Sequence, residues 1–231
     1  MGKAAIGILM LDTKFPRVLG DIGHKETWDF PVHMRVVHGA SASQVIEDDP
    51  RLLLPEFIKA GHQLILQGCS GLTTSCGFLG LIQTELKDAL GVPFASSPLM
   101  QLPMIEAMLP AGQEAGVLTI SEKNLTPEHL VACGARANTA ITGLPRNSVF
   151  AEMIFNNKND IDIDACRKDV CLSAERLVSS GPMIGAIVLE CTNLAPYAHD
   201  IAKATRKPVY SIVSFLNWFQ SGLKPYHFRN N

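Results

Sequence analysis

The two halves of this 231-residue chain share an order of features, and this repeat constrains the fold more than any other property of the sequence. Each half has a Gly-led apolar run, then a cysteine at the end of a short predicted strand, then a proline-led segment 17 residues after the cysteine. The cysteines are 115 residues apart, as are the prolines, and the Gly-led runs are 109 apart. The matching positions are Gly7 and Gly116, Cys76 and Cys191, and Pro93 and Pro208. The repeat predicts two like-folded lobes related by a pseudo-twofold axis.

Short apolar runs alternate with segments of helical periodicity, which is typical of an α/β fold with mostly parallel sheets. Strands are expected at 4–11, 70–75, 92–96, 115–120, 137–141 and 186–190, and helices at 52–67, 78–90, 126–133, 149–156 and 162–179. The region after the first strand is expected to be rich in loops. We expect two pseudo-symmetric α/β/α lobes, formed by residues 1–98 with 208–231 and by residues 99–207. The active site is expected in the cleft between them, since α/β proteins bind ligands outside the carboxyl ends of parallel strands.

Composition and charge argue against several classes of function. The formal net charge of −2, without runs of Lys or Arg, argues against nucleic acid as a partner, because phosphate binding needs a basic surface. No segment approaches the ~20 apolar residues that span a bilayer, so no membrane association is expected and the cytoplasm is the expected location. The run 4–11 ends in Asp12 without a cleavage pattern, which favours a strand over a signal peptide. The six cysteines lack C-x-x-C or zinc-finger spacing, which predicts reduced thiols and no metal.

Cys76 and Cys191 are the candidate catalytic residues. Each follows a predicted strand and precedes a predicted helix, where backbone N–H groups favour a negative charge and therefore a thiolate. One such cysteine could equally be a small buried apolar residue. Two at matching places in a repeat favour a function, because a pseudo-twofold axis places them on opposite walls of one cleft. The remaining cysteines, Cys69, Cys133, Cys166 and Cys171, are expected to have packing roles.

The segments Ser75-Cys76-Gly77 and Glu190-Cys191-Thr192-Asn193 resemble those of the aspartate/glutamate/hydantoin racemase superfamily. The strands at 7–12 and 116–119 are also similar, and 19–23 with 30–32 resembles a subgroup whose substrates are poorly assigned. The resemblance spans nearly the whole chain, and the cysteine pair in this spacing is its most specific element.

The resemblance implies a racemase or epimerase that needs neither pyridoxal phosphate nor a metal. One cysteine, as a thiolate, takes the α-proton of a small carboxylate-bearing substrate, such as aspartate, glutamate or a hydantoin, and the other returns a proton to the opposite face. A planar carbanion needs an acid/base group on each side, which the two thiols would supply. The family also implies a homodimer or higher homo-oligomer. The implied substrate-binding residues are Asp12, Ser75, Gly77, Phe78, Thr119, Ser121, Thr192 and Asn193, with backbone N–H groups after each cysteine stabilising the carbanion.

Two positions depart from the pattern of the amino-acid racemases. Gly77-Phe78 stands where those enzymes typically have Asn-Thr, and Asn193 stands where they often have His or Glu. The substrate is therefore left open. Arg17, Arg35 and Lys14 are candidate carboxylate anchors, although solvated surface charge is their default interpretation.

Other functions stay open beside racemisation. Within the superfamily these are a maleate-type cis–trans isomerase and an arylmalonate-type decarboxylase, although the latter keeps only the second cysteine, so the presence of Cys76 argues against it. From another class, the chain could be a non-catalytic ligand-binding protein or a thiol redox sensor, since a fold does not fix a function. A redox sensor would join Cys76 to Cys191 in a disulfide. A generic α/β protein with packing cysteines is the remaining alternative.

Overall fold

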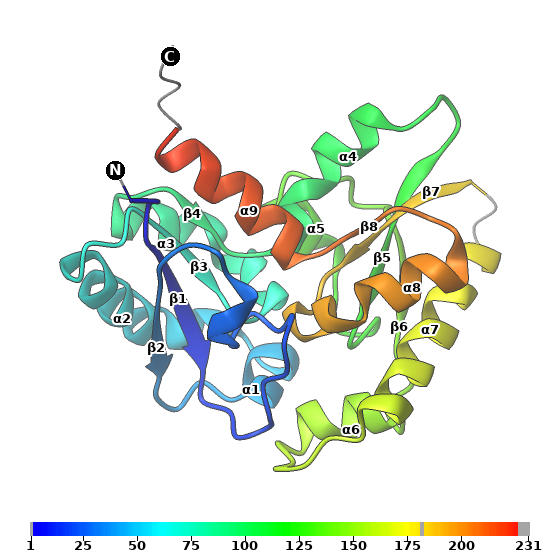
Figure 1. The fold of residues 1–231 in the computed structure, drawn as a ribbon, viewed down its shortest axis with the longest axis horizontal. Helices are drawn as coiled ribbons and strands as arrows, with labels where there is room; N and C mark the ends of the chain where they lie inside the picture. The colour runs from blue at the N-terminus through cyan, green and yellow to red at the C-terminus, as the bar shows by residue number, and fades with distance from the viewer. Residues whose placement is uncertain (1, 181–182, 226–231) are drawn as a thin grey trace.

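The computed structural model describes residues 2–180 and 183–225. It contains two four-stranded parallel sheets with the same topology, in the orders β2-β1-β3-β4 and β6-β5-β7-β8. Figure 1 shows the two sheets in separate lobes, with the first half of the chain in blue to cyan and most of the second in green to orange. The shared strand order confirms the two α/β lobes that the sequence repeat predicts.

The first sheet is built around β1 (Ile6–Leu11), whose six residues are all buried. Its other strands are β2 (Val32–Val37), β3 (Gly71–Thr74) and β4 (Phe94–Ala95). The helical segments of this half are η1 (Lys25–Thr27), α1 (Ala42–Glu47), η2 (Pro50–Leu53), α2 (Leu54–Leu66), η3 (Gly77–Ile82) and α3 (Gln83–Leu90), where η marks a 3-10 helix. A central parallel strand is covered on both faces by helices, which explains why β1 is a continuous apolar run.

The second sheet repeats this plan. Its strands are β5 (Glu114–Thr119), β6 (Ala140–Gly143), β7 (Ile184–Leu189) and β8 (Val209–Tyr210). The helical segments around it are η4 (Pro98–Gln101), α4 (Leu102–Met108), α5 (Pro127–Ala132), α6 (Val149–Phe155), α7 (Ile163–Ser180), η5 (Thr192–Tyr197) and α8 (Ala198–Thr205). One core of buried apolar side chains contains residues of both sheets, so the two lobes pack against each other directly.

The last helix, α9 (Ile212–Leu223), returns to the first lobe. Its residues Ile212 and Phe215 belong to the same buried cluster as Ile6 and Ile8 of β1. The side chain of Gln220 donates a hydrogen bond to the carbonyl of Ala4 at 3.2 Å. The preceding strand β8 belongs to the second sheet, so the chain crosses between the lobes at Ser211, the N-cap of α9. The lobe boundaries at 98 and 208 stay a prediction.

The strands and helices expected from the sequence are present, within a few residues at each end, over the described part of the chain. The region after β1 is less irregular than expected, because β2 lies there and pairs with β1 in parallel. The segments that follow the two cysteines are 3-10 helices rather than α-helices, and each leads directly into an α-helix. In residues 2–180 and 183–225, no helix is both long and apolar enough to cross a membrane.

Candidate active site

Cys76 and Cys191 occupy equivalent places in the two lobes. Cys76 follows β3 and is the N-cap residue of η3, whereas Cys191 follows β7 and is the N-cap residue of η5. Both side chains are buried, and both line the same narrow cavity. Both are free thiols. The sequence prediction that the repeat brings the two cysteines to one cavity is therefore confirmed by their placement, while their roles stay a prediction.

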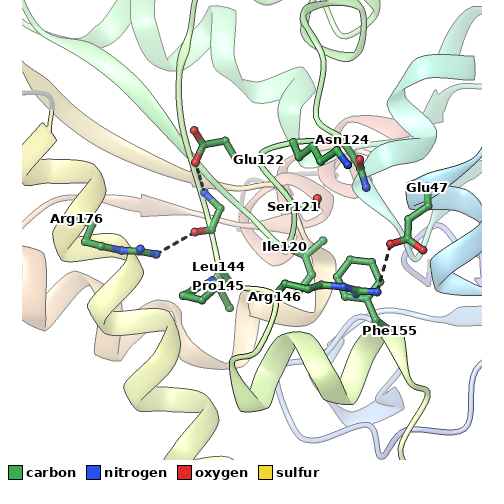
Figure 2. A pocket seen from close by; sticks show the side chains of 12 residues that line it. Glu47, Ile120, Ser121, Glu122, Asn124, Leu144, Pro145, Arg146, Phe155 and Arg176 are labelled. Carbon is green, nitrogen blue, oxygen red and sulfur yellow. Dashed lines mark hydrogen bonds and ion pairs between the residues drawn. The ribbon is translucent and has the colours of Figure 1, made fainter.

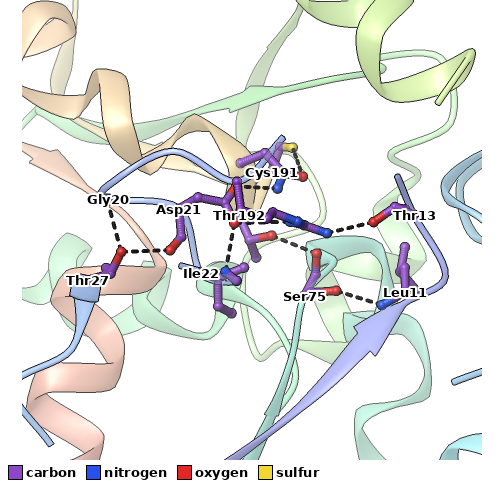
Figure 3. Close-up of polar contacts among 12 residues, drawn as sticks. Leu11, Thr13, Gly20, Asp21, Ile22, Thr27, Ser75, Cys191 and Thr192 are labelled. Carbon is purple, nitrogen blue, oxygen red and sulfur yellow. Dashed lines mark hydrogen bonds and ion pairs between the residues drawn. The ribbon is translucent and has the colours of Figure 1, made fainter. Parts of the chain in front are cut away.

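Reciprocal contacts between the lobes hold the two cysteines in place. The hydroxyl of Thr192 donates a hydrogen bond to the backbone carbonyl of Ser75 at 2.7 Å, as Figure 3 shows. On the other side of the pair, Gly77 lies directly against Glu190, and a Cβ at position 77 would collide with both the carbonyl oxygen and Oε1 of Glu190. The residues that flank each cysteine thus contact those that flank the other.

The wall of the cysteine cavity is mostly apolar. Its apolar side chains are Leu11, Phe15, Ala42, Ile46 and Ile154, which come from β1 and the loop after it, α1 and α6. Ser75 lines it as well, and its hydroxyl accepts a hydrogen bond from the backbone N–H of Leu11 at 2.9 Å. A cavity of this kind excludes water and strengthens electrostatic interactions within it.

One cation, Arg17, lines the cavity within the described residues. Its guanidinium donates hydrogen bonds to Asp21 at 3.0 Å and to the hydroxyl of Thr13 at 2.8 Å, and it lies over the ring of Phe15 at 4.4 Å from the centroid. The side chain is only 17% exposed. Arg17 is therefore a fixed positive charge at the cavity. The default interpretation from the sequence, a solvated surface charge, does not hold for this residue.

A chain of hydrogen bonds connects Arg17 to the thiol of Cys191. Asp21 accepts from the amide of Asn193 at 2.6 Å through its second carboxylate oxygen. The amide oxygen of Asn193 then accepts from the thiol of Cys191 at 3.7 Å. This arrangement favours the protonated form of Cys191, because the thiol is used as a donor and the negative charge of Asp21 lies nearby.

The surroundings of the two thiols differ in charge. Burial raises the pKa of the Cys76 thiol, and the nearby Glu190 carboxylate raises it further; the backbone N–H groups of Phe78 and Leu79 and the charge of Arg17 oppose this. Burial also raises the pKa of Cys191, as do Glu190, Cys76 and Asp21, and only the backbone N–H of Asn193 opposes them. Cys76 thus has two N–H donors and a cation that favour its thiolate, so it is the thiol that ionises more readily of the two.

Glu190 is a buried carboxyl between the two cysteine segments. Its side chain is 0% exposed, and burial raises its pKa to about 7 although the hydroxyl of Thr119, which donates to Oε2 at 2.7 Å, and the backbone N–H of Ile120 oppose the rise. Its other carboxyl oxygen, Oε1, has no hydrogen-bond partner among the described residues. A buried carboxyl without a counter-cation tends to keep its proton.

The structure brings most of the predicted site residues together. Ser75 and Asn193 line the cavity with the cysteines, while Gly77, Thr192 and Thr119 make the contacts that hold the two strand-end segments. The other three of the eight predicted binding residues have neither role. Phe78 is in the core, where its ring packs edge-on against His129, Asp12 is exposed near His38, and Ser121 lines a separate pocket.

That separate pocket lies at the carboxyl ends of β5 and β6 and contains neither cysteine. Figure 2 shows Arg146 between Glu47, with which it forms an ion pair at 3.2 Å, and the ring of Phe155. Glu47 and Phe155 are the chain neighbours of Ile46 and Ile154, which line the cysteine cavity. Residues of α1 and α6 therefore contribute to both spaces.

Sequence reasoning missed the roles of Asp21 and Glu190. Asp21 falls in the segment 19–23 that the resemblance quoted, but nothing in the sequence shows that it pairs with Arg17 and Asn193, which are 4 and 172 residues away. Glu190 directly precedes Cys191, and a charged residue at the end of an otherwise apolar strand was a signal that could have identified it. Among the described residues, no group of three His, Cys, Asp or Glu side chains could hold a metal ion.

Comparison with known proteins gives two kinds of relative. No protein-family profile matches the chain. Dimethylsulfoniopropionate lyase 7 of Emiliania huxleyi (strain CCMP1516) is 28% identical over 230 residues, which cover 95% of this chain and 67% of the lyase. Dimethylsulfoniopropionate lyase 3 of the same organism is 28% identical, but the chain spans only 58% of its length. The dimethylsulfoniopropionate lyase of Durusdinium sp. clade D is 25% identical, with 95% of this chain and 75% of the lyase aligned.

The similar solved structures carry other activities. Arylmalonate decarboxylase aligns with a TM-score of 0.59 at 16% identity, covering 95% of this chain and 92% of that one. Allantoin racemase from Klebsiella pneumoniae aligns with a TM-score of 0.61 at 14% identity, covering 95% and 87%. A putative Asp/Glu racemase from Yersinia pestis aligns with a TM-score of 0.60 at 10% identity, covering 95% and 98%. The chain therefore shares the fold of arylmalonate decarboxylase and of these racemases, which is the fold that the resemblance implies.

Replacing Gly77 by alanine is expected to separate the two strand-end segments. The added Cβ meets the backbone carbonyl of Glu190, which cannot move aside like the end of a flexible side chain, so we expect a loss of at least about 2 kcal/mol in the free energy of unfolding. Gly222→Ala is the matched control, since its Cβ would meet open space on a helix. Urea unfolding measures both. Equal stability of the two variants would contradict the close contact at Gly77.

The buried carboxyl of Glu190 predicts a pH dependence of stability. Because the folded-state pKa of about 7 is above the ordinary 4.5, the contribution of Glu190 to stability is complete below that ordinary value and is lost as the pH rises through about 7. At ~1.4 kcal/mol per pKa unit, the loss approaches about 3 kcal/mol. Glu190→Gln does not titrate, so its free energy of unfolding should gain about this amount relative to the native protein between pH ~4 and ~8. A difference that does not change with pH would show that Glu190 ionises normally.

Proposed function

We propose that this protein is a cofactor-independent lyase that removes the α-proton of dimethylsulfoniopropionate and releases dimethyl sulfide. The observation that carries the proposal is the pair of thiols in one cavity whose wall holds a fixed cation, Arg17. The curated relatives supply the choice of reaction, since those that match over more than 90% of this chain are named dimethylsulfoniopropionate lyases. Acid/base chemistry at the carbon next to a carboxylate is the coarser part of the proposal, and the two thiols and Arg17 in one cavity support it.

The reaction needs one strong base and no redox partner. The substrate carries a carboxylate at one end and a dimethylsulfonium group on the β-carbon. A cysteine thiolate takes a proton from the α-carbon, the electron pair of that C–H bond forms the double bond between the α- and β-carbons, and the C–S bond breaks with its pair on sulfur. The products are acrylate, neutral dimethyl sulfide and a cysteine thiol, so atoms and charge balance.

The site residues divide these tasks. Cys76 is the base, because the N–H groups of Phe78 and Leu79 and the charge of Arg17 favour its thiolate. Arg17 binds the substrate carboxylate and stabilises the negative charge that spreads into it as the proton leaves. Cys191, held as a thiol by Asn193, faces the substrate from the other segment and can return a proton if elimination does not follow. The small-molecule carboxylate ligand, the cytoplasmic location and the homo-oligomer predicted from the sequence remain part of this proposal.

Racemisation at an α-carbon is the second candidate, and a specific observation favours it. Elimination needs one acid/base group, whereas the site holds two thiols in equivalent places, as two-sided proton transfer requires. Gly77 and Phe78 in place of the polar pair of the amino-acid racemases argue for a different substrate. The lyase is the better-supported function because it uses the same first step and matches the names of the sequence relatives.

The test is product formation by the purified protein and its cysteine variants. Incubation with dimethylsulfoniopropionate, followed by gas chromatography, should show dimethyl sulfide, at a rate that rises with pH through the alkaline range because burial raises the pKa of Cys76. Cys76→Ser should reduce kcat by at least about 10²-fold, the usual contribution of a general base, and Cys191→Ser should reduce it less. Cys69→Ser, a buried thiol outside the cavity, is the control and should keep full activity.

The same samples are tested in D2O with L- and D-amino acids, hydantoins and substituted malonates. No dimethyl sulfide from the native protein, together with α-proton exchange and racemisation of one of these compounds, would replace the lyase by the racemase. An equal loss of activity in Cys69→Ser and Cys76→Ser would remove Cys76 from the reaction.

Arg17→Gln is expected to weaken substrate binding. The charge-assisted hydrogen bonds of a buried guanidinium contribute about 1.5–3 kcal/mol each, so KM should rise by about 10-fold or more, with a smaller fall in kcat. Arg35→Gln, which removes an arginine from β2 outside the cysteine cavity, is the matched control and should leave KM unchanged. Steady-state kinetics of the two variants measure both constants. An unchanged KM in Arg17→Gln would show that the substrate carboxylate binds elsewhere.

A further inference from the structure

The position of Glu190 suggests a role that its burial alone does not explain. Its side chain is 0% exposed, it directly precedes Cys191, and its Oε1 lies against Gly77, the residue directly after Cys76. It is thus placed between the two cysteine segments and behind the cavity wall, which it does not line. It reaches the reaction through the thiols rather than through the substrate.

The hydrogen bonds of Glu190 leave its charge without a counter-charge. Oε2 accepts from the hydroxyl of Thr119 at 2.7 Å, the backbone N–H of Ile120 also donates to the carboxyl, and Oε1 has no partner within the described part of the chain. Arg17, the cation of the cavity, pairs with Asp21 instead. The positive charge of Arg17 thereby balances the negative charge of Asp21, whereas no described cation of the cavity balances a charge on Glu190.

The carboxyl of Glu190 acts electrostatically on three thiols. They are Cys76 before η3, Cys191 before η5 and Cys133 after α5, and a charge on Glu190 raises the pKa of each. Two like charges buried close together repel strongly, and their titrations become coupled. The cluster of Glu190 and the cavity thiols therefore carries no more than one negative charge near neutral pH.

We propose that Glu190 is the positioning residue that sets the charge state of the catalytic thiols. Glu190 loses its proton near pH 7, before either cysteine ionises, because the pKa of both thiols is raised further. With its proton lost, the carboxylate holds both cysteines as thiols and makes any thiolate that forms a stronger base. The inference rests on the proposed function, since it matters only if these thiols transfer protons. It also explains Gly77, because any side chain there would displace the carboxyl from its place between the segments.

The test is a titration of the Cys76 thiolate by its ultraviolet absorbance. Each protein is compared with the same protein carrying Cys76→Ser, and the difference gives the midpoint of Cys76 alone. Glu190→Gln removes the charge at nearly constant shape and should lower this midpoint by about one pH unit or more. Glu190→Asp, which keeps a carboxyl, and Asp88→Asn, which removes an exposed charge on α3, should leave it nearly unchanged. The pH profile of the lyase rate should move by the same amount.

A midpoint that stays the same in Glu190→Gln as in the native protein would overturn the inference. Should Glu190→Gln fail to fold, the native protein labelled with carbon-13 at its glutamate carboxyls serves instead. One glutamate should then titrate near pH 7, and titration of every glutamate in the ordinary acidic range would equally overturn it.

Both titrations are made without substrate, so they separate the inference from the proposed function. Shifted midpoints without dimethyl sulfide would leave the control of the thiols standing and remove the lyase. Turnover with unshifted midpoints would leave the lyase standing and remove the role of Glu190.

Discussion

The site depends on one arrangement: the segments at the ends of β3 and β7 touch each other across the two lobes. The hydroxyl of Thr192 binds the carbonyl of Ser75, and Glu190 packs on Gly77. Because each contact joins a neighbour of one cysteine to a neighbour of the other, the backbone positions of Cys76 and Cys191 are fixed relative to each other. The apolar core common to both lobes supports this geometry from behind.

A thiol pair held in this way has a general chemical use. Each cysteine is the N-cap of a 3-10 helix whose N–H groups favour a thiolate, yet burial raises the pKa of both thiols. Such thiols are protonated at rest and strongly basic when ionised, which suits removal of a poorly acidic proton next to a carboxylate. The similar structures include racemases and a decarboxylase, so the fold alone does not choose the reaction. In our proposal, two features determine the reaction: Arg17 binds the substrate carboxylate, and the β-carbon carries a dimethylsulfonium leaving group.

The sequence predicts the fold well, because the repeat and the alternation of strands and helices are local patterns. It also predicts that Cys76 and Cys191 meet in one cavity, since each follows a strand at the matching place of the repeat. It fails where the site is made by contacts between distant segments: Asp21 and Asn193 are 172 residues apart, and Glu190 meets Gly77 across the lobes. Asp12, which the family resemblance implied, follows β1 but is exposed near His38 and does not line the cavity. Periodicity reports which face is buried, but not which buried polar groups meet.

The most direct test of the central claim is a crystal structure with a bound carboxylate that lacks a leaving group, such as propionate. We expect its carboxylate on Arg17 and its α-carbon between the sulfurs of Cys76 and Cys191, with Glu190 against Gly77. A carboxylate bound in the pocket of Arg146 instead, or an α-carbon out of reach of both sulfurs, would contradict the account.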